Sequence, residues 1–141
     1  IYERDGSCTT CHQPDGKGLE NIYPGLVENE WVQGDEERLI KIVLKGLWGD
    51  IEVAGVKYAM NRGVPPMPGL GATLTDKEVA GVLTYVRQSF TNKQPPVRPE
   101  IVARVREATK GRVDFYTVEE ITREHPFPAR PEVRSTALPG R

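Results

Sequence analysis

The stretch Cys8-Thr9-Thr10-Cys11-His12 decides the fold, because it holds both cysteines of the chain and one of its two histidines. Two cysteines three residues apart on a helical turn lie on one face. This spacing, followed directly by a histidine, is the attachment signal of c-type haem: both sulfurs reach the two vinyl groups, and the histidine supplies one axial nitrogen to the iron. The sequence therefore predicts one covalent haem c held by Cys8 and Cys11, with His12 as an iron ligand.

Other interpretations of these residues are weaker. A thioredoxin-like dithiol site lies at a strand-to-helix junction, and no strand is predicted before Cys8. A structural zinc site needs four ligands, and beyond these three residues the chain offers only the distant His125. A plain disulfide would leave His12 unexplained. A zinc module and a dithiol or disulfide site therefore stay as the alternatives to haem.

A haem iron that is closed to substrate needs a second axial ligand, for which Met60, Met67, His125 and the lysines are candidates. Met67 is favoured because Pro66 and Pro68 fix the backbone on both sides of it. Methionine usually fills gaps in cores, so a methionine held between prolines suits a rigid ligand better than packing. Met60 is expected to pack against its neighbours, and His125 to be solvated.

The orientation of His12 also has a predicted source. The second ring nitrogen of a ligating histidine is generally held by a hydrogen bond to a carbonyl or carboxylate. We expect the backbone carbonyl of Pro24 to hold His12, which adds Pro24 to the candidate haem-binding residues; the alternative is that Pro24 is only a turn proline.

The hydropathy pattern predicts a mainly α fold with a short β-hairpin. The predicted elements are a helical segment over 1–12, a helix over 36–46 with Asp35 as N-cap, a hairpin over 51–58, a loop over 59–74, a helix over 76–90 opened by a capping box at Thr75 and Glu78, a helix over 100–110, and a further turn or two from Thr117. The small residues Ala80 and Gly81 allow another helix to approach closely there. The proline-rich end, from Pro126, is expected to wrap a surface or to be mobile.

With these residues in place, the sequence resembles the class I (mitochondrial-type) cytochrome c domain over about residues 1–91. The resemblance rests on the motif Cys8–His12, on Pro24-Gly25-Leu26, on Met67-Pro68 and on the closing helix with Gly81 and Tyr85. It implies a small helical fold wrapped on one haem, with the first and last helices crossing near Gly6 and Gly81–Tyr85. It also implies covalent attachment through Cys8 and Cys11 and iron ligation by His12 and Met67.

Two further stretches resemble bacterial cytochrome domains that are often fused to periplasmic dehydrogenases, including sugar-dehydrogenase-like modules. They are Cys11-His12-Gln13-Pro14-Asp15-Gly16-Lys17-Gly18-Leu19 and Gly34-Asp35-Glu36-Glu37-Arg38-Leu39-Ile40. The resemblance implies redox proteins as electron donor and acceptor and a periplasmic or other extracytoplasmic bacterial location. The chain begins at Ile1, and we interpret it as a processed protein or an excised domain.

Charge and composition exclude some classes of function and indicate that the chain has two parts. The 141 residues carry a net charge of −1, which argues against a nucleic-acid binder, and include no apolar run long enough to span a membrane. Residues 1–91 carry 9 Lys and Arg against 13 Asp and Glu, whereas residues 92–141 carry 10 against 7. We predict a haem domain over 1–91 and a proline-rich linker with a basic extension over 92–141. The extension either docks on an acidic surface or, as we favour, packs on the haem domain.

The function predicted from these features is electron transfer by a carrier that is not itself an enzyme. It is either an electron-transfer protein in its own right or the electron-transfer domain, fragment or subunit of a larger oxidoreductase. An iron ligated by both His12 and Met67 has no free position for substrate. The alternative is an open-site haem protein with peroxidase-like or gas-binding activity, in which Met67 is displaced.

Overall fold

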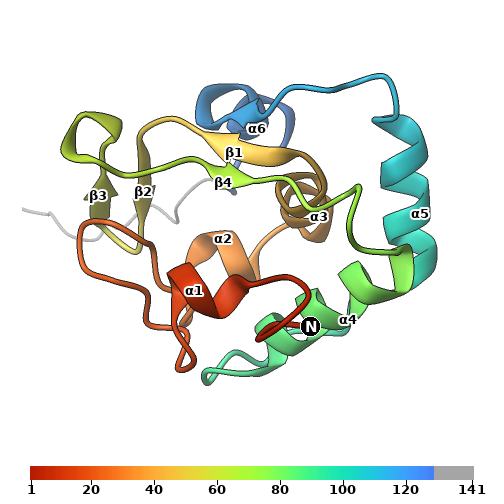
Figure 1. Cartoon of the computed structure of the whole chain (residues 1–141), viewed down its shortest axis with the longest axis horizontal. Coiled ribbons are helices and arrows are strands. Elements are labelled where there is room, and N and C mark those ends of the chain that lie inside the picture. The colour runs from red at the N-terminus through yellow and green to blue at the C-terminus, as the bar shows by residue number, and fades with distance from the viewer. Residues whose placement is uncertain (129–141) are drawn as a thin grey trace, which may run out of the picture.

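Helices make up most of the regular structure in residues 1–128, the part of the chain that the computed structural model describes (Figure 1). In chain order they are α1 (Cys8–His12), α2 (Glu30–Gln33), α3 (Glu36–Lys45), α4 (Asp76–Gln88), α5 (Pro99–Ala108) and α6 (Val118–Glu124), with a 3₁₀ turn at Met60–Arg62. The mainly α fold is therefore confirmed. No helix within these residues is long and apolar enough to cross a membrane. Of the predicted proline-rich end, residues 129–141 lie outside the described part.

The two central helices begin at the residues that the sequence predicts. The Asp35 side chain accepts a hydrogen bond from the backbone N–H of Glu37 at 2.8 Å and caps α3. At the start of α4, Thr75 Oγ1 accepts from the backbone N–H of Glu78 at 3.1 Å, and the Glu78 carboxylate accepts from the N–H of Thr75 at 2.9 Å. This reciprocal pair is a capping box. Both helices then turn their apolar faces into the core.

The strands are short and form two small sheets. They are β1 (Gly46–Trp48), β2 (Ile51–Val53), β3 (Val56–Tyr58), β4 (Met67–Pro68) and β5 (Tyr116–Thr117). β2 and β3 form the predicted hairpin, turning at Ala54 and Gly55 with positive φ angles of 52° and 83°. In the second sheet β1 lies in the middle, antiparallel to β4 and parallel to β5. Pairing between β1 and β5 joins two parts of the chain that no periodicity in the sequence connects.

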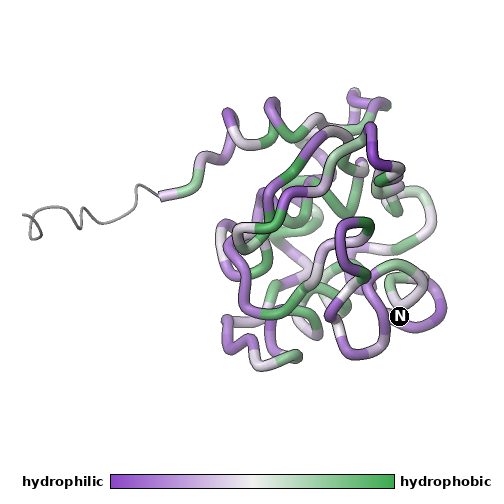
Figure 2. Tube along the Cα trace, turned by 90° about the vertical axis from the view of Figure 1, so that its left-hand side faces the viewer, coloured by the Kyte–Doolittle hydropathy of each residue, from purple (hydrophilic) through white to green (hydrophobic). Residues whose placement is uncertain are grey.

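Residues beyond 91 share the core of the residues before them. Val97, Val102 and Val105 are buried in the same cluster as Val79 and Leu83 of α4. Figure 1 shows α5 beside α3 and α4, and Figure 2 shows hydrophobic and hydrophilic positions alternating along the coils, as amphipathic helices require. The described part of the extension, residues 92–128, therefore packs on the rest of the chain, while the boundary at residue 91 stays a prediction.

The N-terminal segment differs from its prediction. Residues before Cys8 form turns rather than a helix, because Ser7 adopts a left-handed conformation with φ of 54° and interrupts any helix there. The segment packs on α4 through a ring instead of through a helix crossing: the centroids of Tyr2 and Tyr85 lie 5.3 Å apart. A Cβ added to Gly81 would meet nothing within 4 Å. The close approach that Gly81 allows is therefore not made among residues 1–128.

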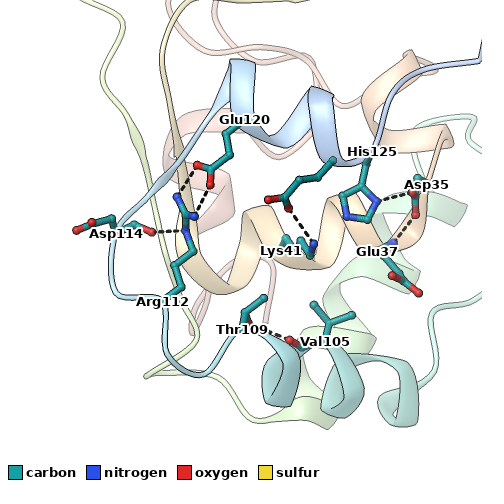
Figure 3. A network of polar contacts seen from close by, with 10 residues as sticks. Asp35, Glu37, Lys41, Val105, Thr109, Arg112, Asp114, Glu120 and His125 are labelled. Atoms are coloured by element: carbon teal, nitrogen blue, oxygen red, sulfur yellow. Dashed lines mark hydrogen bonds and ion pairs between the residues drawn. The ribbon is translucent and has the colours of Figure 1, made fainter.

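His125 is not the solvated residue that the sequence suggests. Its side chain is 13% exposed, and Nδ1 lies 2.8 Å from the Asp35 carboxylate at the start of α3 (Figure 3). Burial raises the pKa of Asp35, but the hydrogen bonds from His125 and from the Glu37 N–H outweigh it, so the pKa lies below its ordinary value. His125 therefore fastens the end of α6 to α3.

Candidate functional site

A mostly apolar crevice brings the sequence-predicted site residues together. It consists of two adjacent cavities of about 590 and 100 Å³ that share Cys8, His12, Pro24 and Met67 in their linings. Cys11 lines the larger cavity. Figure 1 shows α1, which carries the Cys and His residues, facing the ribbon of β4, which carries Met67. A crevice of this size, largely apolar with few polar groups, has the character of a cofactor site.

His12 is oriented as the sequence predicts. Its Nδ1 lies 2.8 Å from the carbonyl oxygen of Pro24, and because a carbonyl only accepts, Nδ1 carries the proton. Nε2 is then the nitrogen with a free lone pair. Burial lowers the pKa of the imidazole below its ordinary value, and the Pro24 carbonyl opposes this only in part. A neutral ring with a fixed tautomer is the form in which histidine binds a metal.

The two cysteines lie three residues apart on α1 and form no disulfide with each other. Burial raises the pKa of the Cys8 thiol above its ordinary value. A protonated thiol in apolar surroundings is a poor nucleophile toward disulfides, which disfavours a reactive dithiol. Both thiols line the larger cavity, on the same wall as His12.

The two methionines lie differently in the crevice. Met67 lines both cavities and packs against both hydrophobic clusters of the core, and its strand is paired with β1 opposite Leu47. Met60 lines only the larger cavity, from the 3₁₀ turn after β3. Met67 is thus the methionine that reaches the inner part of the crevice with His12. His125 lines neither cavity, since it is fastened to Asp35.

Apolar side chains from several elements complete the inner crevice wall. They are Trp31 and Val32 of α2, Leu39, Ile42 and Val43 of α3, Leu47 of β1, Ile51 and Val53 of β2, Val82, Leu83 and Val86 of α4, and, outside these elements, Leu26 and Leu70. Helical periodicity identifies the wall residues of α3 and α4 as apolar-face positions, with the exception of Ile42, but does not show that they face a cofactor. Trp31 was missed altogether, because α2 has only four residues and no periodic signal.

The residues present fit a covalent haem and do not fit a zinc site. The crevice offers two thiols, a neutral imidazole and a thioether along apolar walls, the donor set of a c-type haem with Met/His ligation. Within residues 1–128, no group of three or more His, Cys, Asp or Glu side chains is placed to hold a metal ion. Four protein ligands for zinc are therefore not assembled in the described part of the chain.

Comparison with known proteins identifies the family of the chain. Residues 1–90 match the family described as Cytochrome c. Cytochrome c-552 of Thermus thermophilus is 40% identical over 87 residues, covering 59% of this chain and 62% of that protein. The gluconate 2-dehydrogenase cytochrome c subunit of Pantoea cypripedii is 32% identical over 126 residues, covering 81% of this chain and 26% of the subunit. The fructose dehydrogenase cytochrome subunit of Gluconobacter japonicus is 32% identical over 115 residues, covering 78% of this chain and 22% of that subunit.

The coverage limits what these relatives say about the whole protein. The chain spans 62% of the length of the Thermus protein and about a quarter of the length of the two dehydrogenase subunits. The resemblance to bacterial cytochromes associated with dehydrogenases is confirmed. The match to the gluconate 2-dehydrogenase subunit also includes residues beyond 90, since it covers 81% of the chain.

Proposed function

The chain belongs to the cytochrome c family, and from this premise we propose that it transfers single electrons through one haem c, attached at Cys8 and Cys11 and ligated axially by His12 and Met67. When bound, haem c supplies an iron that cycles between Fe(II) and Fe(III). The observation that carries the proposal is the meeting of both thiols, the His12 ring and the Met67 side chain in one apolar crevice.

The residues of the chain have distinct parts in this function. The Pro24 carbonyl holds the proton of His12 on Nδ1 and leaves Nε2 free to bind iron. The Met67 thioether is a neutral ligand that favours the ferrous state relative to a second histidine. The apolar walls exclude water and disfavour the additional positive charge of the ferric form. Together these effects predict a positive midpoint potential.

The partners proposed are redox proteins, with a dehydrogenase as the electron donor. Support comes from the relatives whose names describe cytochrome subunits of gluconate and fructose dehydrogenases. In this role the chain is an electron carrier within or beside an oxidoreductase, without a catalytic site of its own. Because haem is attached to cysteines outside the cytoplasm, the location proposed is the periplasm or another extracytoplasmic compartment of a bacterium.

Mass spectrometry and a redox titration test the proposal. The chain produced in a bacterium that matures c-type cytochromes should carry the mass of one haem after denaturation, and a variant with Cys8→Ala and Cys11→Ala should not. The haem-loaded protein should titrate as one reversible one-electron centre at a positive potential. A chain that carries no covalent haem, or one with a strongly negative potential, would contradict the proposed attachment or the proposed ligation respectively.

A further inference from the structure

The strand that carries Met67 depends on a part of the chain outside the family match. β4 pairs with β1, in the register Leu47 opposite Met67. The other edge of β1 pairs with β5, where Leu47 is opposite Tyr116. Leu47 thus lies between Met67 and a residue of the extension. A two-residue strand has little stability alone, so what holds β5 also holds the sheet on which Met67 lies.

β5 is itself held by a polar cluster around Arg112 (Figure 3). The Arg112 guanidinium contacts both carboxylate oxygens of Glu120 at 2.5 and 2.6 Å and donates to the carbonyl of Phe115 at 2.6 Å. It also lies 3.8 Å from the centroid of the Tyr116 ring. From α3, Lys45 Nζ donates to the Arg112 carbonyl at 2.8 Å. These contacts fix the loop before β5 and the first turn of α6 against α3.

A second contact from the extension holds the segment that follows Met67. Arg106 of α5 donates to the carbonyl of Gly71 at 2.5 Å and to that of Leu74 at 2.8 Å, and it pairs with the Asp76 carboxylate at 2.6 Å. All three acceptors lie between β4 and the first turn of α4. One guanidinium satisfies them because its donors form a rigid planar fork.

The segment held by Arg106 packs with its backbone against the C-terminal end of α3. The amides of Leu70 and Gly71 donate to the carbonyls of Val43 and Leu44 at 2.7 and 3.0 Å. A Cβ on Gly69 would lie 2.6 Å from the backbone carbon of Lys45, too close for any side chain. The segment therefore packs on α3 through its backbone, and Arg106 of α5 hydrogen-bonds to the same segment.

We propose that Arg106 is a positioning residue for Met67. Arg106 keeps the methionine segment, residues 67–76, closed on α3 and so retains the Met67 thioether in the crevice. The inference rests on the proposed function, since it takes Met67 as an iron ligand. A ligand on a segment that is closed for only part of the time binds in proportion to that fraction. Without Arg106 the segment opens more often, and an added small ligand replaces Met67 more easily.

Titration of the ferric, haem-loaded full chain with imidazole tests this proposal. Arg106→Ala should lower the imidazole concentration at half-displacement about tenfold, the effect of losing hydrogen bonds to a charged group. Arg104→Ala is the matched control: it removes the same charge from the same helix, but Arg104 is exposed and, among residues 1–128, its side chain pairs with Glu37 alone, at 2.7 Å. It should leave the midpoint unchanged. Arg106→Lys keeps the charge but not the planar fork of donors, so its imidazole midpoint should lie between those of Arg106→Ala and Arg104→Ala.

A second control separates positioning from general stability. Val102 is fully buried in the core cluster on the same helix, and its apolar side chain can donate no hydrogen bond to the methionine segment. Val102→Ala should lower the denaturant midpoint of unfolding and leave the imidazole midpoint unchanged. The inference is overturned if Arg106→Ala behaves as Arg104→Ala does, or if imidazole binding follows global stability across all the variants.

Failure of the proposed function would look different. Met67→Ala should bind imidazole much more tightly than the wild type, because no thioether competes. If the wild type binds imidazole as tightly as Met67→Ala does, Met67 is not a ligand and the proposed ligation is wrong. If the wild type resists imidazole and Arg106→Ala resists it equally, the ligation stands and only the role of Arg106 is wrong.

Discussion

The two sides of the crevice are held in different ways. On the His12 side the key contacts are close in sequence: the His12 ring bonds Pro24, 12 residues away, and the Gly18 amide donates to the His12 carbonyl at 2.9 Å. On the Met67 side the contacts with β1 and α3 are joined by contacts from α5, β5 and α6, with Arg106 reaching a carbonyl 35 residues before it. A histidine next to the two cysteines proposed to attach the haem needs little further support, whereas a lone methionine on a two-residue strand needs it from elsewhere.

Truncation of Ile121 should destabilise the Met67 side of the crevice most strongly. Ile121 is fully buried in the cluster against which Met67 packs. Ile121→Ala should lower the free energy of unfolding by about 2–5 kcal/mol, because the cavity left behind adds to the lost burial. Denaturant unfolding measures the loss, and Val113→Ala, at a residue that is 91% exposed, is the control. Equal stability of the two variants would show that the extension is not part of the core.

The contrast between the two sides also explains what the sequence could predict. Helices α3 and α4, the hairpin and the bond from His12 to Pro24 follow from local signals: a cap, a capping box, an alternating pattern and a motif. The parallel pairing of β5 with β1 and the burial of His125 depend on contacts between distant residues, which no local pattern encodes. Met67 could be chosen from its flanking prolines, but its supporting residues could not.

Asn92 tests whether the His12 side needs any residue from the extension. The side chain is 1% exposed, donates to the carbonyls of Leu26 and Val86 at 2.8 Å each, and accepts from the Glu28 amide at 2.7 Å. Asn92→Ala should lower the free energy of unfolding by about 1–3 kcal/mol, because these buried backbone groups lose their hydrogen-bond partner. Denaturant unfolding measures this loss, with Asn61→Ala, at an exposed asparagine, as the control. A cost close to zero would mean that this side is held by local contacts alone.

The ion pair of Arg112 with Glu120 makes a smaller, pH-dependent contribution to the Met67 side. The Arg112 hydrogen bonds are the main cause that lowers the pKa of Glu120 below its ordinary value of 4.5. Because the unfolded chain binds this proton more readily, the pair stabilises the fold at neutral pH, and this contribution is lost as the pH falls below about 5.

Glu120→Gln should therefore lower stability by about 1 kcal/mol at pH 7, with the difference from the wild type shrinking toward pH 3. Unfolding curves collected across this pH range measure both effects. A difference that stays constant, or grows in acid, would show that the charge of Glu120 does not stabilise the sheet.

The ferric absorption spectrum tests the central claim most directly, because a weak band at the red end of the visible reports an iron–methionine bond. The account predicts that the wild type shows this band, that Met60→Ala keeps it and that Met67→Ala loses it. A high-spin ferric spectrum without the band in the wild type would indicate an open iron site and contradict the claim, and so would a Met67→Ala variant that still shows the band.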